Sequence, residues 1–206
     1  MNEKKGSLIV ISGFSGAGKG TVVKRLVEDY GYSLSISATT RAPREGEVDG
    51  REYYFKTKDE FMNLIDYNGL IEWAVYVENY YGTPRAFVEK ELAAGHNVIL
   101  EIEVQGAMNI KQQYPDAILI FLSTKNAAVL KERLTGRGTE APELINKRLK
   151  RAVEESEDMS QYEYIVINDD LDQCVKDVNS IIVAKRCKME ENIEYVNQMK
   201  EELKAL

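Results

Sequence analysis

The feature that most constrains this chain is a glycine-rich turn between an apolar run and a helical run near its start. The segment reads LIVISGFSGAGKGTVVKRL over residues 8–26, and the spacing from Gly13 to Lys19 is G-x-x-x-x-G-K. Glycines let successive backbone N–H groups converge on an anion, and the start of a helix adds partial positive charge. An apolar strand, this loop and a helix in that order are typical of a phosphate-binding loop in an α/β fold.

The loop predicts a site for a nucleoside triphosphate, with ATP as the expected nucleotide. Lys19 can reach the outer phosphates as a point charge. Gly20 stands where a Mg²⁺-ligating serine or threonine commonly follows the lysine, and the next hydroxyl belongs to Thr21. Either Thr21 holds the metal, or phosphates and water hold it. The residues expected to contact ATP here are Gly13, Phe14, Ser15, Gly16, Ala17, Gly18, Lys19, Gly20 and Thr21.

Short aliphatic runs alternate with helical patterns along much of the remaining chain. Nearly continuous apolar runs suit strands that are buried on both faces of a parallel sheet. The pattern therefore predicts an α/β fold, a P-loop NTPase core with a parallel sheet flanked by helices. The apolar runs are 8–12, 97–103, 117–123 and 164–169, and the helical patterns are 19–30, 105–114, 126–135 and 143–156.

Two segments interrupt this series. Residues 34–94 are rich in tyrosine, glycine and polar residues and predict a small mixed α/β insert. Residues 129–157 are dense in charge, with a glycine-flanked joint at 136–138, and predict a helical lid. The core would then comprise residues 1–33, 95–128 and 158–206. Its C-terminal part is helical in pattern and can either pack on the core or pair with a neighbouring subunit, so a homo-oligomer is open.

Charge and cysteine content narrow the function classes. The 206 residues carry a net charge of −7, which argues against general binding to nucleic acid polymers. No apolar run approaches the roughly 18 residues of a membrane span, so we expect no membrane partner. Cys174 and Cys187 would lie beyond disulfide reach on one helix. Free thiols of this kind favour a cytoplasmic location.

A second anion site is predicted downstream of the glycine loop. Arg41 and Arg44 flank Pro43, so a stiff turn can aim both guanidinium groups at one anion. With the hydroxyls of Tyr53 and Tyr81 they suit a monophosphate. Alternatively, the arginines are solvated surface charges and the tyrosines pack in strands.

The carboxylate of Glu72 lies in the apolar run that precedes Tyr81. A carboxylate only accepts hydrogen bonds, so it suits a base edge that donates them. Guanine presents N1–H and N2–H₂ side by side, whereas adenine has no such paired edge. The predicted monophosphate is therefore a guanine nucleotide.

The chain resembles the guanylate kinases. The matching stretches are GFSGAGKGT, SATTRAPREGEVDGREYYF, IEWA, NYYG, LEIEVQGA, RLTGRGTE, INKRL and VINDDL, in family order over roughly residues 6–185. The resemblance implies a parallel-sheet core, a nucleoside-monophosphate-binding insert and a lid. It also implies transfer of a phosphoryl group from MgATP to GMP, giving ADP and GDP, in purine nucleotide metabolism.

The resemblance also assigns residues on the acceptor side. It places Ser37 and Glu72 on guanine and Thr83 near the base, and it places the GMP phosphate on Arg41, Arg44, Tyr53 and Tyr81. Glu101 and Glu103 stand where the family often has aspartate. They are candidates for holding Mg²⁺ through water or for meeting the guanine edge, and these roles stay undivided. The alternative is that they are strand-end carboxylates that keep the sheet soluble.

On the donor side, the resemblance puts Arg137 and Arg148 on the transferring phosphate, with Lys19 as the third catalytic residue. Arginines on a flap can neutralise the charge that phosphoryl transfer spreads over peripheral oxygens. Arg133 is expected beside ATP. Asn168 can meet the adenine, or it can serve only in a turn.

Two other functions are compatible with parts of this pattern. A non-catalytic binding module on the same frame would grip a phosphorylated peptide, but Lys19 and both lid arginines argue against it. A small-molecule kinase would act on a phosphorylated sugar, but Ser37 and Glu72 argue against that.

Overall fold

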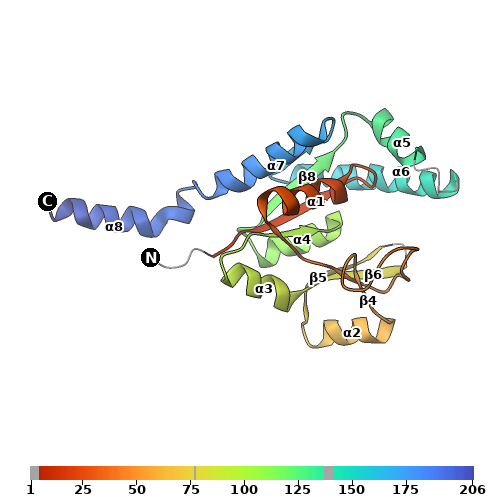
Figure 1. Ribbon diagram of the computed structural model, residues 1–206, viewed down its shortest axis with the longest axis horizontal. Helices are drawn as coiled ribbons and strands as arrows, with labels where there is room; N and C mark the ends of the chain where they lie inside the picture. The colour runs from red at the N-terminus through yellow and green to blue at the C-terminus, as the bar shows by residue number, and fades with distance from the viewer. Residues whose placement is uncertain (1–4, 77, 137–141) are drawn as a thin grey trace.

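The computed structural model describes residues 5–76, 78–136 and 142–206. Figure 1 shows their path from the N-terminus to the C-terminus. The strands are β1 (Leu8–Gly13), β2 (Ser33–Leu34), β3 (Ala38–Thr39), β4 (Tyr54–Phe55), β5 (Leu70–Tyr76), β6 (Asn79–Pro84), β7 (Val98–Glu101), β8 (Ile118–Ser123) and β9 (Tyr164–Ile167). The helices are α1 (Lys19–Tyr30), α2 (Lys58–Asp66), α3 (Arg85–Ala93), α4 (Val104–Gln113), α5 (Ala127–Thr135), α6 (Pro142–Glu157), α7 (Leu171–Lys185) and α8 (Ile193–Lys204), with short 3-10 turns η1 (Met159–Gln161) and η2 (Glu190–Asn192).

The main sheet has five strands in the order β2-β7-β1-β8-β9. All its neighbours pair in parallel, and Val10 of the central β1 lies between Leu100 and Leu119. Every residue of β1 is buried, which explains its unbroken apolar sequence. The carboxyl end of β1 is where the glycine loop begins, at the edge where ligands bind in open α/β sheets.

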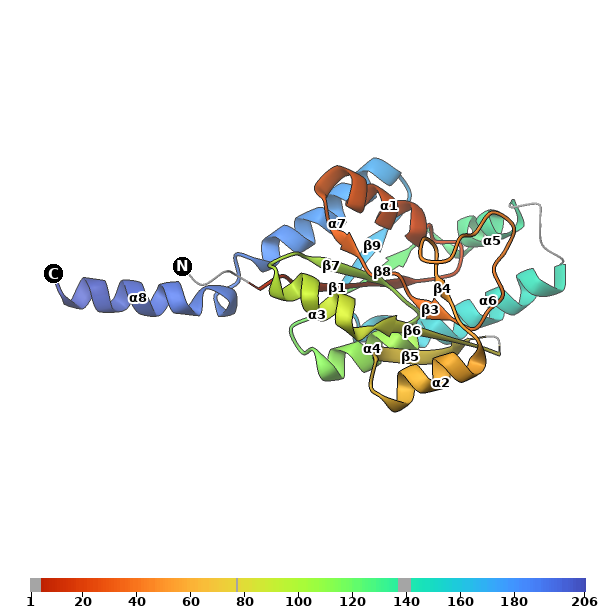
Figure 2. The same cartoon turned by 60° about the horizontal axis from the view of Figure 1, so that its bottom comes forward.

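Helices cover both faces of this sheet (Figure 2). One face packs against α1 and α7 through residues such as Ile9, Leu26 and Val178. The opposite face packs against α3 and α4 through residues such as Val10, Val88 and Ile110. Neighbouring residues of β1 therefore point into opposite layers of the core. This arrangement confirms the predicted α/β fold with a parallel sheet flanked by helices.

A second, mixed sheet lies beside the first, with the strand order β4-β3-β6-β5. Its β3–β4 pair is parallel, and its other pairs are antiparallel. Helix α2 closes this sheet through the fully buried ring of Phe61. The helix begins at Thr57, whose hydroxyl accepts from the Glu60 backbone N–H while the Glu60 carboxylate accepts from the Thr57 N–H. This capping box fixes the start of the helix.

Helices α5 and α6 pack against each other beside the glycine loop. Their apolar contact joins Leu130 and Leu134 of α5 to Leu149 and Ala152 of α6, and it includes Phe14 of the loop. Helices α5 and α6 are thus tied to the loop by apolar packing. Arg137, which was predicted on the lid, lies outside the described residues.

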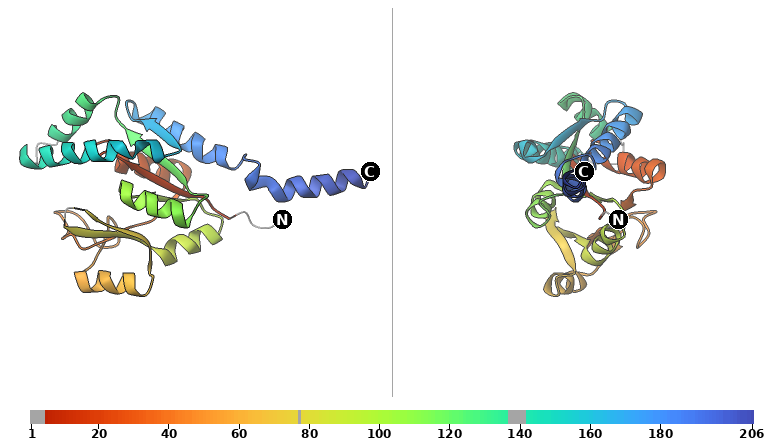
Figure 3. Two further views of the ribbon diagram at one scale, coloured as in Figure 1. Left: turned by 180° about the vertical axis from the view of Figure 1, so that it is seen from behind. Right: turned by 90° about the vertical axis from the view of Figure 1, so that its left-hand side faces the viewer.

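The C-terminal helix α8 points away from the rest of the chain (Figure 3). It buries none of its side chains. Of the two arrangements that the sequence left open, packing on the core is therefore not adopted. Among the described residues, no helix combines the length and apolarity needed to cross a bilayer.

Candidate active site

The glycine loop links β1 to α1 with a backbone shape that other residues resist. Gly18, at the start of α1, has φ 93°. A Cβ atom on Gly18 would lie 2.5 Å from the Asn168 side-chain nitrogen. That nitrogen donates to the Ala17 carbonyl over 2.8 Å. Positive φ and the close amide together leave room only for glycine, and Asn168 holds the loop in place.

Lys19 lies against the same loop. Its ammonium donates to the Gly13 carbonyl over 2.7 Å and lies 3.5 Å from the Phe14 carbonyl. These two carbonyls hold the lysine beside the loop's backbone N–H groups. The Lys19 ammonium would therefore contact a phosphate chain that is bound in the loop.

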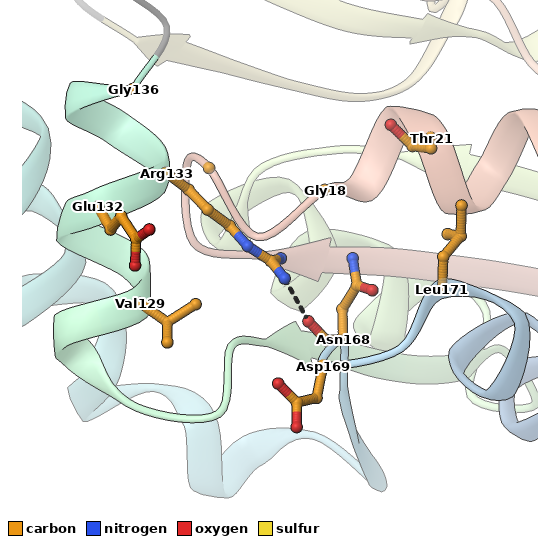
Figure 4. Close-up of a pocket in the computed structure, with 10 residues that line it drawn as sticks. Gly18, Thr21, Val129, Glu132, Arg133, Gly136, Asn168, Asp169 and Leu171 are labelled. Carbon is orange, nitrogen blue, oxygen red and sulfur yellow. Dashed lines mark hydrogen bonds between the residues drawn. The ribbon is translucent and has the colours of Figure 1, made fainter.

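A pocket of about 670 Å³ opens on one side of the loop (Figure 4). Arg133 of α5 crosses it and donates to the Asn168 carbonyl over 2.8 Å and to the Ala17 carbonyl over 3.4 Å. Asn168 is buried, its amide nitrogen donates to the loop, and it lines this pocket. The pocket is lined by Gly16, Gly18, Thr21, Val129, Glu132, Arg133, Gly136, Asn168, Asp169 and Leu171.

A larger cleft of about 830 Å³ runs from the other side of the loop to the second sheet. It shares Gly16, Gly18 and Thr21 with the first pocket, so the loop borders both spaces. A group bound at the loop can therefore be reached from either space. The predicted residues that line the cleft are Phe14, Ser15, Lys19, Gly20, Ser37, Arg41, Arg44, Tyr53, Glu72, Tyr81, Glu101, Glu103 and Arg148.

Arg41 is held rigidly in the cleft wall. Its guanidinium donates to both Glu47 carboxylate oxygens, over 2.9 and 3.0 Å, and lies 5.3 Å from the Tyr53 ring centre. Glu47 also accepts from the Arg44 backbone N–H over 2.7 Å. Sequence reasoning missed Glu47, although a glutamate three residues after Arg44 in the same turn was a usable signal. Its carboxylate preorganises the arginine turn.

Tyr53 and Tyr81 lie next to each other in the same wall. Their ring centres are 5.9 Å apart in an edge-to-face arrangement. Burial, with a smaller contribution from the negative charge of Glu101, raises the pKa of Tyr53 to about 12. The Tyr53 hydroxyl therefore keeps its proton at neutral pH and can donate it to an anion.

Glu72 of β5 lies in the cleft wall with 6% of its surface exposed. One carboxylate oxygen accepts from the Thr83 hydroxyl over 2.6 Å. Burial raises the pKa of Glu72 to about 7, although the bonds from Thr83 oppose this. Thr83 is itself fully buried and is not among the cleft-lining residues, so its contact with a base would be indirect, through Glu72.

Glu101 and Glu103 lie where β7 ends and α4 begins. Burial raises the pKa of Glu101, and the nearby charge of Lys19 opposes that rise. A Cβ atom on Gly20 would lie 3.7 and 3.8 Å from the Glu101 oxygens. At these distances a Cβ atom would make only ordinary contact, so the Glu101 oxygens lie close to the loop at Gly20. Carboxylate oxygens are ligands that suit a Mg²⁺ ion.

The lid meets the loop through α6. Arg148 donates to the Ser15 hydroxyl over 3.4 Å and lines the larger cleft. One turn further, Arg151 lies 3.3 Å from Glu155 and donates to Glu154 over 2.9 Å. Arg148 is therefore already beside the loop without any further movement of α6.

Glu155 is a buried acid at the base of the lid, with 3% exposure. Burial, reinforced by the negative charge of Glu103, raises its pKa from 4.5 to about 7. The unfolded chain then loses this proton at lower pH than the folded chain does. The residue's contribution to the free energy of unfolding is accordingly undiminished below pH 4.5, falls as the pH rises toward 7, and stays reduced above that.

We expect Glu155→Gln to remove this pH-dependent loss, because glutamine keeps the shape but carries no charge. At each pH we compare the free energy of unfolding of the variant with that of the unmodified chain. This difference should favour the variant by about 2 kcal/mol more at pH 8 than at pH 5. Urea titrations of both proteins at the two pH values measure it. An equal difference at both pH values would contradict the assignment.

Comparison with known proteins shows the family of the chain. The sequence model of the guanylate kinase family matches residues 5–185. The chain is 47% identical to guanylate kinases of Caldanaerobacter subterraneus subsp. tengcongensis, over 97% of this chain and 98% of the relative, and of Halalkalibacterium halodurans, over 98% and 99%. The crystal structure of guanylate kinase from Anaplasma phagocytophilum superposes with a TM-score of 0.76 at 29% identity, covering 91% of this chain and 90% of that chain. The chain therefore belongs to the guanylate kinase family.

Proposed function

We propose that the chain transfers the γ-phosphoryl group of MgATP to GMP, giving ADP and GDP. Family membership makes it a nucleoside monophosphate kinase. The observation that best supports GMP as the acceptor is the buried carboxylate of Glu72 in the wall of a cleft that begins at the glycine loop. ATP would occupy the pocket beside Arg133, and GMP the larger cleft.

The acceptor is bound by groups on the second sheet and its connecting turns. Arg41 and Arg44, with the hydroxyls of Tyr53 and Tyr81, would hold the GMP phosphate. Glu47 supports this role because it fixes the arginine turn. A bound phosphate is charged at neutral pH and is its own nucleophile, so the reaction needs no general base.

Glu72 and Ser37 would read the base. The two N–H groups on the Watson–Crick edge of guanine can both donate to a carboxylate. Their donation favours the ionised form of Glu72, whose pKa is raised to about 7 by burial. Thr83 would keep the carboxylate turned toward the cleft.

Transfer itself depends on position and charge. The loop N–H groups and Lys19 would hold the donor phosphates, and Arg148 and Arg137 would neutralise charge on the transferring group. Phe14 ties the loop to the lid helices, so lid position and loop position are coupled. A closed lid also keeps water, a competing acceptor, away from the phosphoryl group.

Mg²⁺, when bound with ATP, would lower the net negative charge of the phosphate chain. We propose that Glu101 would hold the ion through water, since its carboxylate oxygens lie close to the loop at Gly20. Glu103 and the hydroxyl of Thr21 are the further candidates in the same cleft.

The proposal divides the chain as the sequence suggests. Residues 34–94 would supply the GMP-binding groups, residues 129–157 would form the lid, and the remaining segments would form the core. Within 34–94, Leu34 of β2 and helix α3 belong structurally to the main sheet and its packing. A cytoplasmic location fits the two free cysteines, Cys174 and Cys187. Whether α8 joins two copies into a homo-oligomer stays open.

The function is tested by supplying the purified chain with ATP, Mg²⁺ and one acceptor at a time. The acceptors are GMP, AMP, CMP and ribose 5-phosphate, and chromatography identifies the products. We expect GDP and ADP in equal amounts from GMP and only traces of product from the others. A binding module would phosphorylate none of them, and a sugar kinase would prefer ribose 5-phosphate.

Arg148→Ala should lower kcat far more than it weakens GMP binding, because its contacts strengthen in the transition state. The loss of kcat can approach the ~10³-fold known for arginine fingers. Steady-state kinetics and calorimetry of GMP binding measure the two effects. Arg186→Ala, on the turn after α7, is the matched control and should leave both values unchanged. Equal losses in kcat and in GMP affinity for Arg148→Ala would contradict the assignment.

A further inference from the structure

Gly106 lies directly against the carboxylate of Glu72. It occupies the first turn of α4, is buried, and lines the larger cleft. A Cβ atom on Gly106 would lie 2.5 Å from the second oxygen of Glu72, 3.2 Å from its carboxylate carbon and 3.3 Å from Ile102. No side chain fits between the helix and the carboxylate.

The Glu72 carboxylate has no easy retreat from this contact. Its first oxygen is held by the Thr83 hydroxyl over 2.6 Å. Thr83 is fully buried, and the backbone of Glu72 pairs with Thr83 in the β5–β6 ladder. The carboxylate is therefore fixed between β6 on one side and the first turn of α4 on the other. The positive end of α4 also favours its charged form.

We propose that Gly106 is a positioning residue that sets where the base-reading carboxylate stands, and so contributes to the choice of guanine. The proposal rests on the proposed function, in which Glu72 reads the base of GMP. Glycine is required here by the close approach of a helix backbone to a functional carboxylate. Nothing in the backbone shape of Gly106 itself demands glycine, because it lies within a regular helix.

The consequence is a specific defect in Gly106→Ala. Alanine favours a helix more than glycine does, so the fold should survive the change. The added methyl group must push the carboxylate away from its place. Misplacement of about 1 Å can cost ~10²-fold in rate or affinity. We expect the GMP dissociation constant and KM to rise by about that factor, while KM for ATP stays the same.

A double-mutant cycle tests whether the methyl group acts through the carboxylate. Glu72→Asp shortens the side chain by one methylene and so leaves room for the methyl of Gly106→Ala. We expect each single variant to bind GMP more weakly than the unmodified chain. If the methyl group acts through the carboxylate, the loss of GMP affinity in the double variant should be at least ~5-fold smaller than the two single losses multiplied together. Calorimetry with GMP measures the dissociation constants of the unmodified chain, the two single variants and the double variant, and calorimetry with a non-hydrolysable ATP analogue is the control for the donor side. The four proteins are compared at temperatures where all of them are equally folded.

Two outcomes would overturn the proposal. One is unchanged GMP affinity in a folded Gly106→Ala variant. The other is a cycle in which the two losses simply multiply, because the methyl group would then act elsewhere. Either result can occur while the unmodified chain still phosphorylates GMP, so failure of this proposal is distinguishable from failure of the proposed function.

Discussion

Replacing Glu72 by glutamine should lower kcat/KM for GMP sharply and reduce a preference for GMP over AMP that we expect to be ~10⁴-fold or more. Above the Glu72 pKa of about 7, AMP would set its N1 lone pair against the ionised carboxylate of the unmodified chain. The carboxylate is buried to 6% exposure, so it could not exchange that clash for contact with water. An unpaired buried charge is the most costly mismatch that a base pocket can impose.

In Glu72→Gln, one of the two hydrogen-bond acceptors of the side chain is replaced by a donor. The glutamine amide can donate to adenine N1 while its oxygen accepts from the exocyclic amine of adenine. The measurement is kcat/KM for both nucleotides in both proteins. Glu155→Gln is the matched control, since it also neutralises a buried glutamate beside the cleft but should leave the GMP-to-AMP ratio unchanged. An unchanged ratio in Glu72→Gln would mean that this residue does not read the base.

Lys19→Ala should lower kcat by ~10³-fold or more while the fold stays intact. The lysine lies against the Gly13 and Phe14 carbonyls and is the charge closest to the expected position of the donor phosphates. Alanine keeps the helix start and removes only that charge. Lys24→Ala, an exposed lysine on α1, is the matched control and should retain full activity. Wild-type kcat in a folded Lys19→Ala variant would refute the role.

The sequence predicts the main sheet and its helices closely because their residues repeat in buried patterns. The expected helix at 19–30 is observed over the same residues, and the apolar run at 117–123 contains β8 (Ile118–Ser123). Each of these two segments begins and ends at a clear change in the sequence pattern. The strands β2, β3 and β4 have two residues each, too short to show a periodic signal.

The candidate site is only partly readable in the sequence. The glycine loop has a fixed spacing, so its lysine and its helix follow from local sequence. The pairing of Arg41 with Glu47, the contact of Phe14 with the lid and the support of Glu72 by Thr83 depend on how turns and strands meet. Such contacts need tertiary structure. Gly106 is the clearest case, because its importance comes from a carboxylate more than 30 positions away in the chain.

We expect ATP and GMP to bind at the same time on the two sides of the glycine loop, ATP beside Arg133 and guanine beside Glu72. Calorimetry with two bisubstrate analogues tests it most directly, one linking adenosine to guanosine through a polyphosphate and the other linking two adenosines. The account predicts one molecule of the adenosine–guanosine analogue per chain, displacement by either substrate, and much weaker binding of the adenosine–adenosine analogue. Equal affinity for the two analogues, or binding that GMP does not compete with, would contradict it.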